Sequence, residues 1–184
     1  MRKKNLAYVL LADGFEEAEA LVPFDMLKRG GAEVFTVSIG QERERTGSHG
    51  IKVVADQTLA DGLAADYDLL VLPGGPGTEN LRDSEAVRAE ILKAAAAGKL
   101  IGAICAAPSV LGGMGLLNGR KATCFPGYEE YFQGVTLTDD SVVEDGNFVT
   151  AIGAGASYEF GLKLVEKLTD KANADDVRRR IFLR

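Results

Sequence analysis

The chain has 184 residues, of which 46% are hydrophobic and 26% are charged, and its formal net charge is -6 at pH 7. This composition is ordinary for a globular protein, and the length suffices for one domain with a substantial core. The negative charge argues against a general nucleic-acid-binding protein, which needs a basic surface. No apolar run reaches the roughly 20 residues of a membrane-spanning helix.

Cysteine usage and the first residues indicate a cytoplasmic protein. The two cysteines, Cys105 and Cys124, are too few for a disulfide framework, which favours a reducing compartment. Basic residues 2–4 precede an apolar run at 6–12, as in a signal peptide, but acidic residues follow at once and no small-residue cleavage site is present. The run therefore predicts a first buried strand.

Taken in chain order, apolar runs alternate with helical patterns. Four runs predict buried strands, at residues 6–12, 34–39, 69–72 and 100–104. Helices are expected at 16–30, 84–98, 108–112, 157–168 and 175–184, from their caps and apolar stripes. Pro23 should kink or restart the first helix, and Ser157 should cap the fourth.

The remaining segments are expected to be short or irregular. Polar residues 41–50 predict a loop, 51–55 a short strand and 121–125 a further strand. Residues 142–150 are typical of a hairpin that turns at Asp145 and Gly146.

Strands that alternate with helices imply a parallel sheet covered on both faces. Right-handed crossovers then give an α/β fold, a flavodoxin-like three-layer sandwich with a mostly parallel sheet. In such folds ligands bind beyond the carboxyl ends of the strands. Three of these ends carry reactive or flexible groups: the glutamates of 16–19, the glycine-rich loop 73–77, and Cys105. We expect a site where they meet.

Cys105 is the candidate nucleophile. It follows a short apolar strand, and Pro108 marks a helix start three residues later, so it lies on a sharp strand-to-helix turn. Other α/β enzymes place a reactive serine on a strand-to-helix turn of this kind, which is called a nucleophile elbow. The helix N-terminus favours thiolate, which predicts a pKa of ~4–7, below the free value of ~8.5. The alternative is a cysteine that only packs in the core.

A cysteine nucleophile needs a proton-transfer partner. The only histidine, His49, pairs with Cys105 only if the loop 41–50 folds over the site; otherwise it is solvated. Glu16 and Glu19 share one helix face, whereas Glu17 points elsewhere. A carboxyl facing a thiolate stays protonated and can give its proton to a bound oxygen. The alternative is that all three glutamates are solvated first-turn charges.

Backbone amides are the candidate oxyanion donors, at Gly74 and Gly75 after one strand and at Ala106 after Cys105. The loop 73–77 lacks the Gly-Lys-Ser/Thr ending of a phosphate-binding loop, and residues 153–155 lack the third glycine of a dinucleotide fingerprint. No cluster has metal-ligand spacing. We therefore expect neither a cofactor nor a metal.

Together these stretches resemble the ThiJ/PfpI superfamily, in the branch of the human parkinsonism-associated deglycase and its bacterial relatives. The matching stretches occur in family order across nearly the whole chain. They are DGFEEAE at 13–19, VLPGG at 71–75, AICAAP at 103–108 and GAGAS at 153–157.

The resemblance implies a single ThiJ/PfpI-like domain over residues 1–184 and a homodimer. It implies Cys105 as the elbow nucleophile, Glu19 as its carboxyl partner, and amides near Gly74, Gly75 and Ala106 as oxyanion donors. The implied activity is that of a cofactor-free glyoxalase or protein deglycase, acting on methylglyoxal-type dicarbonyls or their adducts.

Two departures from the family bear on that activity. The protease-like branches place a histidine directly after the cysteine, where this chain has Ala106, which argues against a peptidase. The human branch member has a histidine before a proline near the site, where this chain has Phe125 before Pro126. Proton transfer is left to Glu19. The alternative function is a non-catalytic redox sensor, in which protonated Glu19 stabilises oxidised Cys105.

Overall fold

The computed structural model describes residues 5–184, so the basic residues at 2–4 lie outside the described part. Seven strands form the main sheet: β1 (Leu6–Leu11), β2 (Glu33–Ser38), β5 (Gln57–Thr58), β6 (Leu69–Leu72), β7 (Leu100–Ile104), β10 (Val142–Asp145) and β11 (Phe148–Ala151). Their order across the sheet is β10-β11-β7-β6-β1-β2-β5. Every neighbouring pair is parallel except β10 and β11, which form an antiparallel hairpin.

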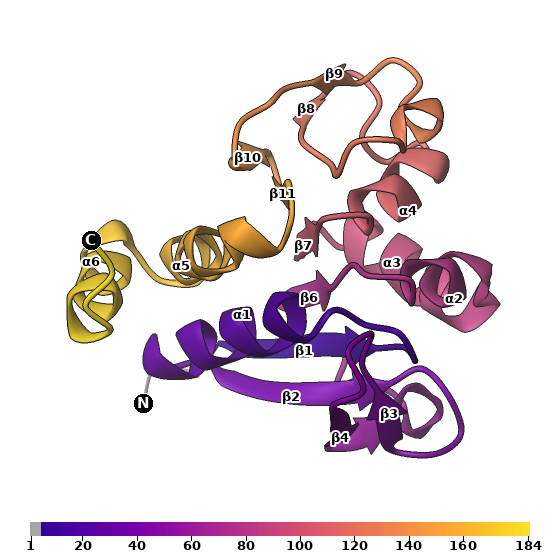
Figure 1. Ribbon diagram of the computed structural model, residues 1–184, viewed down its shortest axis with the longest axis horizontal. Coiled ribbons are helices and arrows are strands. Elements are labelled where there is room, and N and C mark those ends of the chain that lie inside the picture. The colour runs from indigo at the N-terminus through magenta and orange to yellow at the C-terminus, as the bar shows by residue number, and fades with distance from the viewer. Residues whose placement is uncertain (1–4) are drawn as a thin grey trace.

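Helices cover both faces of this sheet. They are α1 (Glu17–Arg29), α2 (Thr78–Asp83), α3 (Glu85–Ala96), α4 (Pro108–Gly113), α5 (Ser157–Leu168) and α6 (Lys171–Arg180). In Figure 1, α5 and α6 lie on one side of β7 and β11, and α2, α3 and α4 lie on the other. The predicted flavodoxin-like three-layer arrangement is confirmed. Within residues 5–184, none of the helices combines the length and apolarity needed to cross a lipid bilayer.

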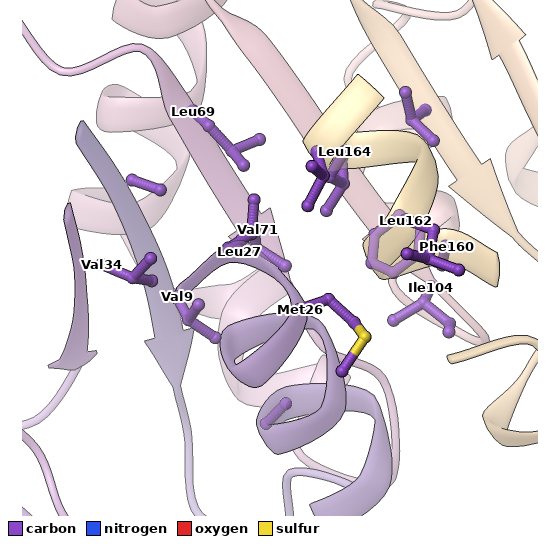
Figure 2. Packing of buried hydrophobic residues seen from close by; sticks show 14 of the residues in the cluster. Val9, Met26, Leu27, Val34, Leu69, Val71, Ile104, Phe160, Leu162 and Leu164 are labelled. Atoms are coloured by element: carbon purple, nitrogen blue, oxygen red, sulfur yellow. The ribbon is translucent and has the colours of Figure 1, made fainter. Parts of the chain in front are cut away.

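The continuous apolar runs become strands buried on both faces, as expected for a covered parallel sheet. Successive side chains of a strand point to opposite faces. In β1, Val9 therefore joins the core under α1 and α5, whereas Leu10 joins the core under α3 and α4. Figure 2 shows Met26 of α1 and Phe160 of α5 among the side chains of the first of these cores. Phe160 is fully buried there.

Polar segments differ most from the expectation. The predicted loop 41–50 contains β3 (Glu44–Thr46), which pairs antiparallel with β4 (Lys52–Val54). This hairpin has no alternation of apolar residues, and an ion pair between Lys52 Nζ and Glu44 Oε1 at 2.8 Å joins its strands. The predicted strand 121–125 is limited to β8 (Lys121–Ala122), which pairs with β9 (Thr136–Leu137). Three short 3-10 helices, at Leu59–Asp61, Glu129–Tyr131 and Ala154–Ala156, lie in the connections.

Three details of the helices also differ from the prediction. α1 passes through Pro23 without restarting, which leaves the kink as the other alternative, and Pro23 is buried where Gly161 lets α5 approach closely. Ser157 is the first residue of α5 but makes no capping hydrogen bond. α6 begins at Lys171 rather than at 175, because the side chain of Asp170 accepts a hydrogen bond from the amide of Asn173 at 2.9 Å.

Candidate active site

Cys105 lies on the predicted elbow, between the end of β7 and the start of α4. Its φ angle is 62°, in the left-handed region, which costs a non-glycine residue about 1–3 kcal/mol. Its amide donates to the carbonyl of Ala151 at 2.8 Å, and its carbonyl accepts from the amide of Phe125 at 2.9 Å. These contacts from neighbouring segments hold the strained turn, which presents a half-buried thiol at the carboxyl end of the sheet.

Behind the elbow, buried polar contacts fix the start of α4. Ser109 Oγ donates to the carbonyl of Ala106 at 2.6 Å and accepts from Arg82 Nη2 at 2.8 Å. The Arg82 guanidinium lies 4.2 Å from the centre of the Tyr131 ring. Cys124 Sγ donates to the carbonyl of Cys105 at 3.1 Å. The sequence did not indicate Arg82 as a supporting residue, because α2, which carries it, was not predicted.

Glu19 is the carboxyl that faces the thiol. Its exposed fraction is 1%, and it shares a hydrogen bond with Cys105. Glu16 sets its position, because the Glu16 carboxylate caps α1 by accepting from the amide of Glu19 at 2.7 Å. The amide of Glu16 in turn donates to the carbonyl of Gly74 at 3.0 Å, which joins α1 to the loop after β6. The alternative, that all three glutamates are solvated first-turn charges, does not hold, because Glu19 and Glu17 are buried.

Gly74 leaves room for this pair. A Cβ at Gly74 would lie 2.6 Å from Glu19 Oε2 and 2.7 Å from Cys105 Cβ, so no larger residue fits. The Gly74 amide, predicted as an oxyanion donor, donates instead to Glu19 Oε2 at 3.0 Å. The amides of Gly75 and Ala106 form hydrogen bonds to the sulfur of Cys105. Two of the three predicted donors are therefore directed at the sulfur.

Burial raises the pKa of Glu19 to about 7, and the charge of Glu16 acts in the same direction. Burial also raises the pKa of Cys105, to about 12, and the charge of Glu19 and its hydrogen bond to the thiol add to this effect. The predicted lowering of the Cys105 pKa is wrong, because the thiol faces an acidic partner in a buried site. The amides of Gly75 and Ala106 oppose the rise without overcoming it.

Glu19 and Cys105 consequently titrate as a pair. Below about pH 7 the pair holds two protons, one on each group. Above about pH 7 it holds one proton, mainly on the sulfur, because the thiol has the higher pKa. In the smaller fraction of molecules that hold the proton on Glu19, the carboxylate charge that raises the pKa of Cys105 is removed, and the sulfur is a thiolate.

The other glutamate of the first turn, Glu17, has a separate role. It accepts hydrogen bonds at 2.8 Å from the amide of His49 and at 3.1 Å from Ser48 Oγ, and its Oε2 lies 2.8 Å from His49 Nδ1. Burial favours a higher pKa, but these hydrogen bonds lower the pKa of Glu17 to about 2. His49 therefore ties its loop to α1 and does not pair with Cys105.

Glu16, Glu17 and His49 also form the one cluster among the described residues that could hold a metal ion, with ligand atoms within 4.8 Å of one another. Their spacing in the sequence did not indicate it. Both oxygens of Glu17 already accept hydrogen bonds from the loop at 48–51. In this structure the carboxylate of Glu17 therefore joins that loop to α1 through hydrogen bonds.

We predict that alkylation of Cys105 by iodoacetamide accelerates as the pH rises through about 7. Loss of the first proton from the Glu19–Cys105 pair creates the thiolate, so the midpoint follows the raised pKa of Glu19. Mass spectrometry of both cysteines provides the control. Burial raises the pKa of Cys124 to about 12 as well, but its sulfur has backbone amides rather than a carboxyl as hydrogen-bond partners, so Cys124 should show no step near pH 7. Glu19→Gln should remove the step near pH 7. A midpoint unchanged by this substitution would contradict the pairing.

Comparison with known proteins places this site in a family. A model described as the DJ-1/PfpI family matches residues 5–167. The glutathione-independent glyoxalase DJR-1.2 of Caenorhabditis elegans is 34% identical over 169 residues, 90% of this chain and 89% of the nematode protein. Deglycase PH1704 of Pyrococcus horikoshii is 37% identical over 144 residues, 77% of this chain and 86% of that protein.

Other relatives are longer than this chain. Protein DJ-1 homolog B of Arabidopsis thaliana is 40% identical over 177 residues, which is 95% of this chain but 40% of the plant protein, so the chain spans less than half of that relative. A solved structure of similar size is a cysteine-to-alanine mutant of the DJ-1 superfamily protein STM1931 from Salmonella typhimurium. It is 40% identical with a TM-score of 0.92, over 97% of this chain and 98% of the other. By sequence and by fold, the chain belongs to the DJ-1/PfpI family.

Proposed function

We propose that the protein is a cofactor-free, cysteine-dependent glyoxalase or deglycase that acts on methylglyoxal-type dicarbonyls or their early adducts. The observation that carries the proposal is the buried Glu19 carboxyl, hydrogen-bonded to Cys105 on a strained elbow. This arrangement supplies a nucleophile and a proton-transfer group without a histidine. Relatives named as a glyoxalase and a deglycase support the choice of substrate class.

The first step forms a carbon–sulfur bond. The Cys105 thiolate attacks the aldehyde carbon of methylglyoxal, and the carbonyl electron pair moves to oxygen. In this proposal the amides of Gly75 and Ala106, which are hydrogen-bonded to the sulfur, donate to the developing oxyanion. Protonated Glu19 gives its proton to that oxygen, which leaves a hemithioacetal and a carboxylate.

The second step moves one proton between neighbouring carbons and one between their oxygens. The Glu19 carboxylate removes the proton from the carbon bound to sulfur, which gives an enediolate, and returns it to the adjacent carbon, while the hydroxyl proton passes from the oxygen on the sulfur-bearing carbon to the oxygen on its neighbour. The product is a lactoyl thioester on Cys105. Water then cleaves the thioester, so that lactate leaves and the sulfur is restored. An early adduct enters the same steps once its amine or thiol has departed.

We predict that both members of the pair are required for lactate formation from methylglyoxal. Cys105→Ser should reduce the rate to background, because a serine hydroxyl is a far weaker nucleophile at neutral pH. Glu19→Gln should lower kcat by about 10²–10⁴-fold, the usual contribution of a general acid–base group. Glu33→Gln, an exposed glutamate at the start of β2, is the matched control. Equal rates with and without the thiol would remove the proposal.

A second proposed role uses the same pair as a peroxide sensor. The thiolate reacts with hydrogen peroxide to give a sulfenic acid and hydroxide, and a second peroxide gives the sulfinic acid and water. Protonated Glu19 can donate a short, charge-assisted hydrogen bond to a sulfinate oxygen. The buried position of Glu19, at 1% exposure, favours this role because it keeps that proton on the carboxyl.

We predict that limited peroxide converts Cys105, and not Cys124, to a single sulfinate. Glu19→Gln and Glu19→Asp should each lower the sulfinate yield, because the donated hydrogen bond is lost or lengthened. Peptide mass spectrometry measures the oxidation state of both cysteines. Comparable oxidation of the two cysteines, or a yield that ignores the Glu19 variants, would speak against a sensor.

A further inference from the structure

Phe125 is an exposed aromatic residue beside the nucleophile that the reaction above does not use. Half of its surface is exposed, at 50%, although its amide is bonded to the carbonyl of Cys105 at 2.9 Å. Single exposed apolar side chains are ordinary on protein surfaces. A contiguous apolar surface next to a reactive group instead indicates a binding site.

Phe125 forms one wall of such a surface, which we call the apolar groove. The groove has a cavity volume of about 460 Å³ and is lined by Phe125, Pro126, Ser141, Ile152 and residues 153–156. None of these described residues carries a charge, and Ser141 contributes the only polar side chain among them. A groove of this composition suits an apolar group of a ligand and offers no cation to bind a phosphate or carboxylate.

The groove lies beside the backbone of Cys105, whose carbonyl accepts from the amide of Phe125 and whose amide donates to the carbonyl of Ala151, the residue before Ile152. Strands β7 and β11 are parallel and in register up to Ala151, so Ile152 follows at the level of Cys105. The segment after Ile152 lies against Phe125, since a Cβ on Gly153 would be 3.6 Å from Phe125 Cδ2. Two walls of the groove therefore flank the residue that carries the thiol.

The proton-transfer groups lie on the opposite side of Cys105. Strand β7 has β6 on one side, which leads to Gly74 and Gly75, and β11 on the other, which leads to the groove. A carbon bound to the sulfur of Cys105 carries an oxygen, a hydrogen and one larger substituent. With the oxygen at Glu19 and the amide of Gly75, the larger substituent is directed toward β11.

We propose that the apolar groove is a substrate subsite for the carbon substituent of the reacting aldehyde, with Phe125 and Ile152 as specificity-determining residues. The favoured substrates are then α-oxoaldehydes that carry an aryl or branched alkyl group. The identity of the reacting aldehyde rests on the proposed function, whereas the position of the groove beside Cys105 does not.

Alkylation of Cys105 tests the groove without turnover. The second-order rates of N-benzyl iodoacetamide and of iodoacetamide at Cys105 are measured by mass spectrometry, and their ratio is divided by the same ratio for a small free thiol. We expect a normalised ratio of at least tenfold, because each apolar group that a pocket accepts is worth about 10–200-fold. Phe125→Ala should lower this ratio about tenfold and leave the iodoacetamide rate within about twofold. A ratio unchanged by Phe125→Ala overturns the proposal.

Two further variants guard against a folding defect. Ile152→Thr keeps the β-branched shape while adding a hydroxyl, so it should lower the ratio in the same direction. Phe182→Ala removes another exposed aromatic residue, 89% exposed in the last turn, and should leave the ratio unchanged. If Phe182→Ala lowers the ratio as much as Phe125→Ala does, the preference is not a property of the groove and the proposal fails.

Substrate kinetics separate this proposal from the proposed function. The same variants are assayed for kcat/KM with phenylglyoxal and methylglyoxal, and Phe125→Ala should reduce the first about tenfold more than the second. An equal loss for both substrates contradicts the subsite. If neither substrate is turned over by the unmodified protein but the alkylation ratio still depends on Phe125, the proposed function fails and the subsite stands.

Discussion

The buried contact between the Glu19 carboxyl and the Cys105 thiol determines which hydrogen bonds and which small residue the surrounding structure must provide. An ionisable group that is removed from water is costly unless hydrogen bonds satisfy it. The Gly74 amide satisfies one oxygen of Glu19, and the thiol bonds to the same carboxyl. Gly74 must remain without a side chain for this approach, because any Cβ would meet both members of the pair. The cost of burial is what leaves a proton available at neutral pH.

The three layers of the fold each support this contact. On one face, Glu16 caps α1 and so places Glu19 against Gly74 and Cys105, which follow the carboxyl ends of β6 and β7. Within the sheet, Ala151 of β11 holds the amide of the strained cysteine. On the other face, Arg82 of α2 reaches Ser109, which fixes the turn into α4. The strain of a left-handed cysteine persists because contacts from all sides determine its position.

The sequence was most informative where one local signal determines the structure. The runs at 69–72 and 100–104 are continuous and apolar, so they could form only buried strands, and Pro108 marked the helix that makes Cys105 an elbow. Features that depend on contacts between segments far apart in the sequence could not be predicted. The division of roles between Glu17 and Glu19 depends on how the loop at 47–51 returns to α1. Whether the pKa of Cys105 is raised or lowered depends on the burial of its thiol, which no local sequence pattern encodes.

The central claim is that Glu19 keeps a proton next to Cys105 close to neutral pH. Infrared difference spectroscopy tests it directly, because a protonated carboxyl has a carbonyl stretch that a carboxylate lacks. Spectra of the unmodified protein minus Glu19→Gln, recorded from pH 5 to 9, should contain this band at pH 6 and lose it with a midpoint near the raised pKa of about 7. A band already absent at pH 6 would show that Glu19 is an ordinary carboxylate and would contradict the account.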